Sequence, residues 1–244
     1  MNTIRLWAMI VGIVCLLTWQ PTAQQAQPKH AQQVLDRMAQ AMGYAQAAQF
    51  RTIQVVGTME YPAQGLKGQF EAFYKSPDKF LMKINIQGIG EILQGYDGKV
   101  GWEKNPMTGL RELQGAELQQ LRQSALSGAN NDIRKMVRNA KLQNQEKVGG
   151  RNAFVITAQS ATGGAMKLYI DAQRYLLLRI DSEVATPQGK MNATMLFEDY
   201  RKVDGVIYAF TTRQSAAGMT TLIKIVRVRH NAPVNDAIFR KPTN

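Results

Sequence analysis

The sequence has little that could cross-link the chain or bind a metal. Cys15 is its only cysteine, and His30 and His230 are its only histidines in 244 residues. Neither histidine belongs to a group with the spacing of metal ligands. Because no cysteine follows residue 15, the remainder of the chain cannot form an internal disulfide bond and depends on its own hydrophobic core. Roughly 220 residues suffice for such a core, and β-rich chains of this length often form one domain.

Motifs for catalysis are also missing. Ser160 and Ser182 do not lie in a nucleophile-elbow context, and the glycines lie at hairpin turns and not in a phosphate-binding loop. Asp97 and Asp171 are the carboxylates that could be considered, but a tight turn explains Asp97 better and a strand end explains Asp171. Nothing supplies an activated nucleophile or a paired acid and base, so we expect no enzyme, no cofactor and no metal site.

Acidic residues are few compared with basic ones. The chain has 30 Lys and Arg against 18 Asp and Glu, which gives a formal net charge of +12. A surplus of this size favours anionic partners such as lipid headgroups or acidic proteins. The basic residues are dispersed and no nucleic-acid-binding motif accompanies them, so we do not expect nucleic acid as a partner. Dispersed positive charge on a solvated surface explains the same composition without any partner.

One long apolar run is present, near the N-terminus, and no second one follows. It spans residues 6–19, after Arg5 and before a Gln-rich segment. The run is too short for a comfortable membrane span, and its flanks are typical of a secretory signal peptide. We expect residues 1–23 to be this signal, with cleavage as late as residue 26, and an exported, soluble protein. A retained anchor is the alternative; lipidation at Cys15 is not expected, because Val14 precedes it.

Alternating strands dominate the sequence that follows. Between residues 80 and 87, apolar side chains alternate with mostly polar ones, and residues 190–198 repeat the pattern. This alternation is typical of antiparallel sheets that bury one face and expose the other to water. Hairpin signals such as Asp97-Gly98 separate the strands. We therefore expect an antiparallel meander of about ten strands.

Two segments have helical spacing. Residues 30–48 place apolar side chains on one face, and Gly43 is a candidate for the end of that helix. A helical insert is expected at 115–139, with one helix over 115–127 and another over 131–139. A few short helices must then cover the apolar face of a long sheet, which makes a hydrophobic cargo cavity worth considering.

Several short motifs follow one another in a characteristic order. Gly68-Gln-Phe-Glu-Ala-Phe-Tyr-Lys75 leads into Ser76-Pro-Asp-Lys-Phe80, and Gly95-Tyr-Asp-Gly-Lys99 precedes Gly101-Trp102 and Asn105-Pro106. Leu168-Tyr-Ile-Asp171, Phe197-Glu-Asp-Tyr200 and Val234-Asn-Asp-Ala-Ile-Phe239 complete the order. This arrangement resembles the periplasmic lipoprotein carriers of the LolA/LolB superfamily, the outer-membrane lipoprotein-sorting proteins, over most of the chain that follows the signal.

The resemblance implies a mainly β fold with some α (α+β) over a single domain, residues 29–244. The fold is an antiparallel incomplete β-barrel (half-barrel) with helices capping the concave apolar face. The cavity of that family accepts the acyl chains of lipoproteins and carries them across the periplasm. Where the family pattern has an arginine that helps latch the lid helices, this chain has Ser76. A differently held lid is therefore expected.

The same resemblance sets the expected partners. These are an acylated lipoprotein or another lipid, an inner-membrane transporter and an outer-membrane acceptor, with the protein itself a periplasmic monomer. Related members bind other lipids or act as envelope-stress sensors, so a sensor or regulatory module is an alternative. A structural periplasmic protein whose apolar face packs without cargo is another.

Inward-facing positions supply the candidate lining of the cavity. The chain has 12 methionines, and their flexible side chains suit a site that repacks around variable ligands. The candidates are Val55, Phe70, Met82, Ile84, Ile86, Trp102, Met166, Leu168, Met195, Phe197 and Phe210. The alternative interpretation makes each of them an ordinary core residue beneath the helices.

Overall fold

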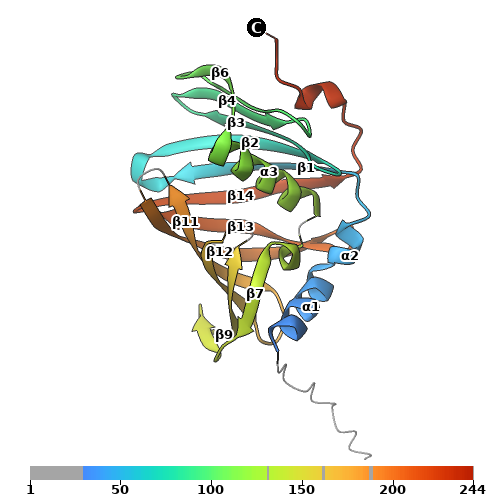
Figure 1. The fold of residues 1–244 in the computed structure, drawn as a ribbon, viewed down its shortest axis with the longest axis vertical. Helices are drawn as coiled ribbons and strands as arrows, with labels where there is room; N and C mark the ends of the chain where they lie inside the picture. The colour runs from blue at the N-terminus through green and yellow to red at the C-terminus, as the bar shows by residue number, and fades with distance from the viewer. Residues whose placement is uncertain (1–29, 131, 161–162, 187–188, 244) are drawn as a thin grey trace, which may run out of the picture.

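The computed structural model describes residues 30–130, 132–160, 163–186 and 189–243. Within these ranges, fourteen strands join into one antiparallel sheet that curves around the helices (Figure 1). The strands are β1 (Thr52–Tyr61), β2 (Leu66–Lys75), β3 (Lys79–Ile86), β4 (Gly90–Tyr96), β5 (Gly101–Asn105), β6 (Gly109–Glu112), β7 (Val137–Leu142), β8 (Glu146–Val148), β9 (Arg151–Ser160), β10 (Ala165–Asp171), β11 (Leu177–Thr186), β12 (Gly189–Val203), β13 (Val206–Ala216) and β14 (Met219–His230).

The order of the strands leaves the sheet open. Across the sheet they run β6-β5-β4-β3-β2-β1-β14-β13-β12-β11-β10-β9-β7, and β8 pairs with β9 outside this path. Neighbours in sequence are therefore mostly neighbours in space, and the β1–β14 pair joins the first half of the chain to the second. The expected half-barrel is confirmed, although its strands are more numerous than the ten or so expected from the sequence.

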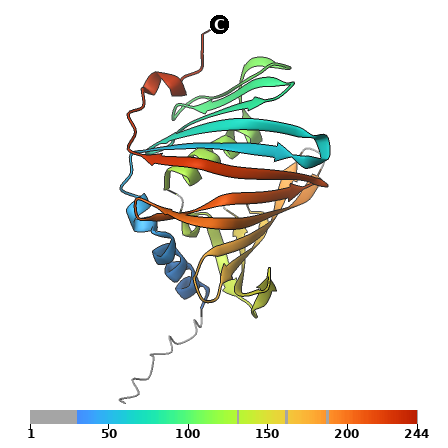
Figure 2. The same cartoon turned by 180° about the vertical axis from the view of Figure 1, so that it is seen from behind.

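Three helices lie on the concave side: α1 (Ala31–Met42), α2 (Tyr44–Ala47) and α3 (Gly115–Asn130). Gly43 ends α1 with a left-handed backbone, φ 76°, as expected from the sequence. Val34, Leu35, Met38 and Met42 are all buried on the inner face of α1, which confirms the helical spacing. Figure 2, from behind, shows β1, β2 and β14 in front of α3. No helix in the described ranges is both long and apolar enough to cross a membrane.

The expected second helix of the insert, over 131–139, is wrong. After α3 the chain forms a short 3-10 turn at Ile133–Lys135 and then enters β7. Asp132 begins that turn, because its carboxylate accepts a hydrogen bond from the Arg134 N–H. β7 gains its backbone hydrogen bonds by pairing with β9, with an irregularity between Arg138 and Lys141. Pairing with the sheet therefore outweighs the helical spacing of this segment.

The C-terminal segment lies on the outer face of the sheet. It contains a 3-10 turn at Asp236–Phe239, within which Phe239 is fully buried against Leu81 and Trp102. Two ion pairs hold the start of this turn: Lys75 Nζ lies 2.5 Å and Lys79 Nζ 2.7 Å from the carboxylate of Asp236. The end of the chain is thereby fixed to the turn between β2 and β3.

These ion pairs predict a pH-dependent contribution to stability. The hydrogen bonds from Lys75 and Lys79 lower the pKa of Asp236 to about 2. Because this folded-state pKa lies below the unfolded value of about 3.9, the stabilisation is complete above that value and is lost as the pH falls towards 2. We expect Asp236→Asn to lower the denaturation midpoint at pH 6 and to have progressively less effect between pH 4 and pH 2, as chemical denaturation will measure. A mutational effect that does not depend on pH would contradict this assignment.

Candidate functional site on the concave face

Cross-strand pairing defines which side chains share the concave face. Residues that lie opposite one another in an antiparallel sheet project to the same side. Phe70 on β2 lies opposite Gly57 on β1 and Ile84 on β3, and Ile84 lies opposite Ile92 on β4. This apolar row extends from the centre of the sheet towards the edge formed by β6.

The row continues across the second half of the chain. Met59 on β1 lies opposite Ile223 on β14, Ile223 lies opposite Thr212 on β13, and Thr212 lies opposite Phe197 on β12. On β12, Met195 lies opposite Ile180 of β11. One apolar face therefore spans both halves of the half-barrel.

Each helix covers a separate part of this face. α1 packs on Phe154, Ile156 and Leu168 of the β9–β10 wing. The α2 segment, with Ala47 and the following Phe50, packs on β1, β13 and β14. α3 packs through Leu121 and Ala125 on residues of β2, β3 and β4. The helices thus fix both wings and one end of the concave face.

Between and beyond the helices, apolar side chains remain partly accessible. We call the half-buried apolar residues of this face the concave strip. Because they alternate with outward-facing residues, they form a band on the inner side of the sheet. The strip consists of Val55, Met82, Ile84, Ile92, Met166, Ile180, Met195, Phe197, Ile223 and Ile225.

Most of the lining expected from the sequence lies on this face. Six of the eleven candidates belong to the concave strip, namely Val55, Met82, Ile84, Met166, Met195 and Phe197. Phe70 and Ile86 are on the same face, but each is only 7% exposed. Leu168 and Phe210 are packed core residues under α1 and α2, so for these two the ordinary-core interpretation fits the structure.

Trp102 is misplaced in the expected lining. Its side chain lies on the outer face, 1% exposed, in a cluster with Leu81 and Phe239. The indole Nε1–H donates a hydrogen bond to the Phe239 carbonyl oxygen at 2.9 Å. In the short strand β5 it is Gly101 that faces α3, because Gly101 lies opposite Tyr96. A five-residue strand without clear alternation gives the sequence no means to fix this orientation.

Four members of the concave strip were not expected from the sequence: Ile92, Ile180, Ile223 and Ile225. On β14 the alternation is hidden, because Leu222 and Val226 place apolar side chains on the outer face as well. The β1–β14 register also shifts between Val56 and Gly57. The period of two over Thr221, Ile223 and Ile225 was the signal that could have found this strand's share of the strip.

Arginine contacts also hold α1 to the β7–β10 side of the sheet. Arg134 Nη1 lies 2.9 Å from Asp36 on α1, and its other nitrogens bind Asp132. Burial acts to raise the pKa of Asp132, but hydrogen bonds from Arg134 outweigh it and hold that pKa below its usual range. Arg37 donates a hydrogen bond to the Tyr175 hydroxyl at 2.7 Å. At the family's latch position, Ser76 is exposed in the turn between β2 and β3.

α3 is held by a second arginine cluster. Arg111 on β6 binds Glu103 at 3.2 Å and Glu117 of α3 at 2.8 Å. The hydrogen bond from Arg111 lowers the pKa of Glu117. Gln94 donates to Glu103 at 2.8 Å, so a small polar depression of about 170 Å³ lies under α3 beside the apolar strip.

His230 has a structural role that the sequence does not reveal. Its ring stacks on Phe50 with 3.8 Å between ring centroids. Nε2 lies 2.8 Å from the Tyr208 hydroxyl and Nδ1 lies 2.7 Å from an Asp204 carboxylate oxygen. Burial, with a smaller effect of Asp204, raises the pKa of Tyr208 above its usual range, so the hydroxyl stays protonated near neutral pH. The hydrogen bonds that join Asp204, His230 and Tyr208 hold the His230 ring against Phe50, in the segment between α2 and β1.

The acidic residues considered for catalysis have turn roles. The Asp97 carboxylate accepts from the Lys99 and Val100 N–H groups, and that of Asp171 from Gln173 and Arg174. In the part of the chain that the structure describes, no group of three or more His, Cys, Asp and Glu side chains could hold a metal ion.

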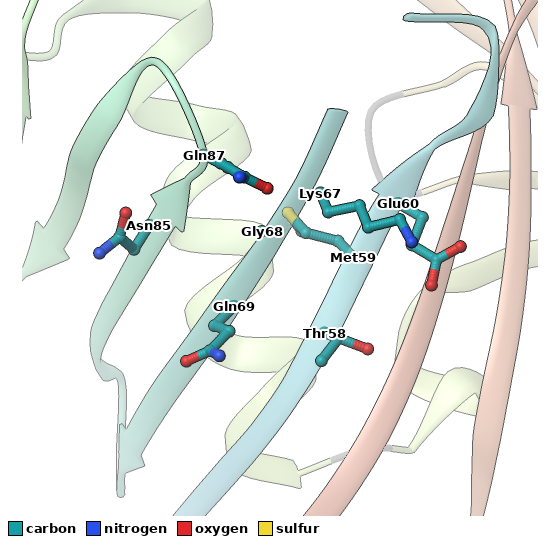
Figure 3. A pocket seen from close by; sticks show the side chains of 8 residues that line it. All are labelled: Thr58, Met59, Glu60, Lys67, Gly68, Gln69, Asn85 and Gln87. Carbon is teal, nitrogen blue, oxygen red and sulfur yellow. The ribbon is translucent and has the colours of Figure 1, made fainter. Parts of the chain in front are cut away.

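The outer face has a shallow polar depression of about 480 Å³. Figure 3 shows its lining, which comes from β1, β2 and the end of β3. Glu60, Lys67, Gln69, Asn85 and Gln87 supply charged and amide groups there. None of the eleven expected lining residues takes part in it, so it is separate from the concave strip. A second depression of about 430 Å³ includes Phe197 beside Tyr200 and Arg174.

Solved structures with similar folds are LolA-like. A LolA superfamily protein from Nitrosomonas europaea aligns with a TM-score of 0.57 and 14% identity, over 88% of this chain and 99% of its own. A domain assigned to outer-membrane lipoprotein sorting, from Vibrio parahaemolyticus, gives 0.56 and 15%, over 87% and 97%. A DUF1329 family protein from Desulfovibrio piger gives 0.61 and 16%, over 86% and 97%. Identities this low show the fold alone, and that fold is LolA-like.

Sequence comparison adds no closer relative. A scan against protein-family models finds no match, and a search of curated proteins finds none either.

The position of Trp102 yields a fluorescence prediction. Trp7 and Trp19 lie in the expected signal peptide, so Trp102 is the only tryptophan that remains after its removal. We expect Phe239→Ala to shift its emission to longer wavelength and to lower the free energy of unfolding by about 3 kcal/mol. A fatty-acid ligand with a bromine quencher on its chain should leave the emission unchanged, because the indole lies on the outer face. Strong quenching would place the ligand on the outer face and contradict binding to the concave strip.

Proposed function

We propose that this chain carries acyl chains, of lipoproteins or of another lipid, against the concave face of its half-barrel. The observation that supports this most directly is the concave strip, whose apolar side chains remain only half-buried although several of them pack beside the helices. Large exposed apolar patches on a folded protein commonly mark interaction sites. An acyl chain is a ligand that covers such a band without needing hydrogen-bonding groups.

The energetics of acyl burial are adequate for a carrier. Each methylene removed from water contributes about 0.8 kcal/mol, so a sixteen-carbon chain supplies roughly 10 kcal/mol before ordering costs. A carrier must also release its cargo, which an adaptable lining favours. Met82, Met166 and Met195 supply flexible thioether side chains in the strip.

The remaining parts of the proposal follow the LolA-like fold. We infer export to the periplasm after removal of the N-terminal signal, and transfer of the cargo toward the outer membrane. An inner-membrane transporter would load the protein and an outer-membrane acceptor would receive the cargo, with the carrier itself a monomer and not an enzyme. The lid would be α1 and α3, held by Arg134 and Arg111 because the latch position is Ser76.

The first test is native mass spectrometry with lipid extraction on the protein purified from its own envelope. We expect a co-purifying lipid or acyl-peptide, because the strip gains free energy when it is covered. The mass of the bound species distinguishes lipoprotein from phospholipid or glycolipid. A ligand-free mass, together with no binding of a fluorescent fatty acid, would overturn the carrier proposal and favour a structural role.

A pair of substitutions separates cavity from core. Met195→Glu places a charge on the half-buried strip, and we expect a folded protein whose fluorescent fatty-acid binding is weaker by at least about tenfold. Leu168→Glu places the same charge in fully buried core, and we expect loss of the cooperative unfolding transition. Circular dichroism and probe titration measure both.

The matched control is Leu196→Glu, one residue from Met195 on β12 and on the opposite face. It should remain folded and bind the probe as the unsubstituted protein does. Equal loss of probe binding in Leu196→Glu and Met195→Glu would show that the concave strip is not the site.

A further inference from the structure

The hairpin turns at one edge of the half-barrel carry no charge. β1–β2, β3–β4, β5–β6 and β13–β14 are antiparallel hairpins whose turns all lie at the same end of the strands. We call these four turns with their flanking residues the uncharged rim. It comprises residues 61–66, 87–90, 105–110 and 216–219, among which there is no Asp, Glu, Lys or Arg, and it is bordered by Glu60, Lys67, Glu91, Lys104 and Arg111.

The opposite end of the sheet has a different composition. The β2–β3 turn contains Asp78, the β4–β5 turn contains Asp97 and Lys99, and the β12–β13 turn contains Asp204. The same strands thus end in charged turns on one side and uncharged turns on the other. In a chain in which 20% of residues are charged, solvated turns alone do not account for this asymmetry.

Exposed apolar side chains gather on the uncharged rim. Among the described residues, five large hydrophobic side chains are exposed, and three of them lie on the rim: Ile89 at 38%, Met107 at 84% and Met219 at 54%. They come from three different hairpins. Each is placed at a turn, where it makes no contribution to the core and gains nothing from facing water.

The turns of the rim are neighbours in space. The 3-10 turn at Pro62–Gln64 contacts β14, and a Cβ at Gly90 would lie 3.3 Å from Pro106. In both views the β1–β2 and β13–β14 turns lie side by side, at the left edge of the sheet in Figure 1 and at the right edge in Figure 2. The rim is therefore one surface and not four separate loops.

The rim leads into the concave strip. Met219 lies opposite Ala216, and Ile223, four residues further along β14, lies on the same face of the strand. Ile223 in turn lies opposite Met59 on β1. An acyl chain that passes the rim at Met219 would meet apolar side chains of the strip next.

We propose that the uncharged rim docks on the surface of an anionic lipid bilayer, so that cargo passes between the bilayer and the concave strip. This rests on the proposed carrier function and names the surface that it must reach. Proteins that bind at a bilayer interface insert apolar side chains into it, while nearby basic residues attract the anionic headgroups. The β13–β14 hairpin fits this pattern near the rim: its nearest charged residues are Arg213 and Lys224, and no acidic residue occurs between 206 and 230.

The test is sedimentation of the envelope-purified protein with vesicles of phosphatidylethanolamine and phosphatidylglycerol, compared with vesicles of phosphatidylcholine alone. We expect binding to the anionic vesicles, weaker at high salt. Met219→Asp and Met107→Asp should each weaken that binding by about tenfold or more, because a carboxylate would have to enter the headgroup region. Binding of a fluorescent fatty acid in solution should be unchanged in Met107→Asp, because the β5–β6 turn lies several strands away from the entry path at Met219.

The matched control is Val226→Asp, on the same strand as Met219. Val226 is 65% exposed but lies away from the rim, so the substitution adds the same charge and should leave vesicle binding unchanged. Equal weakening by Val226→Asp and Met219→Asp would overturn the proposal, since it would reflect net charge alone. Absence of vesicle binding by the unsubstituted protein would also overturn it and leave the rim as a protein interface.

The two proposals fail in different ways. If the unsubstituted protein binds vesicles through the rim but does not bind the fatty acid, the carrier function is wrong and the docking surface stands. If it binds the fatty acid and Met219→Asp leaves vesicle binding intact, the docking surface is wrong and the carrier function stands. Loss of both activities in the Met107→Asp variant, with the fold intact, would contradict a docking surface that is distinct from the ligand site.

Discussion

The structure depends on a mismatch between the apolar face of the sheet and the helices available to cover it. The described sheet has fourteen strands, whereas α1 and α3 have only 12 and 16 residues and α2 a single turn. A helix rises about 1.5 Å per residue, so these helices cannot span a curved sheet of this width. Burial of the apolar face is therefore incomplete, and its half-buried residues make up the concave strip. The strip is thus a consequence of the area of the sheet and not of a few special residues.

The strip stays open because packing holds the sheet on both sides of it. Clusters under α1 and α3 fix the two wings, and the cluster of Phe50, Phe210 and Val228 fixes the centre. Curvature at the centre is aided by the register shift at Gly57, where a Cβ would lie 2.5 Å from the Phe70 ring. Closing the strip would require the wings to move together against these clusters. The surface ion pairs of the helices, such as Arg134–Asp36, are individually weak, so α1 and α3 are held mainly by their buried apolar faces.

Long alternating strands were the most predictable part of this molecule. On β3 and β12, the period of two predicts the concave face residue by residue, since register and hydrophobic pattern agree there. Prediction failed where that agreement was absent. Trp102 stands in a strand too short to show a period, and the residues of β7 have helical spacing that pairing with β9 overrides. Neither the cluster of His230 with Asp204 and Tyr208 nor the Arg134–Asp36 pair has a sequence signal, because their members are far apart in the chain.

The two ends of the strands differ in what covers the concave face. At the end with charged turns, α2 and Phe50 close the concave face, and the buried His230 ring joins the helical segment to the sheet. At the other end, no described helix lies over Met219, and the inner face continues from this residue to Ile223 without a charged side chain. An apolar ligand that covers a charged side chain desolvates it at a cost in free energy. Along this path it would cover none. Under the proposed carrier function, entry and exit of an acyl chain are therefore expected at the uncharged end.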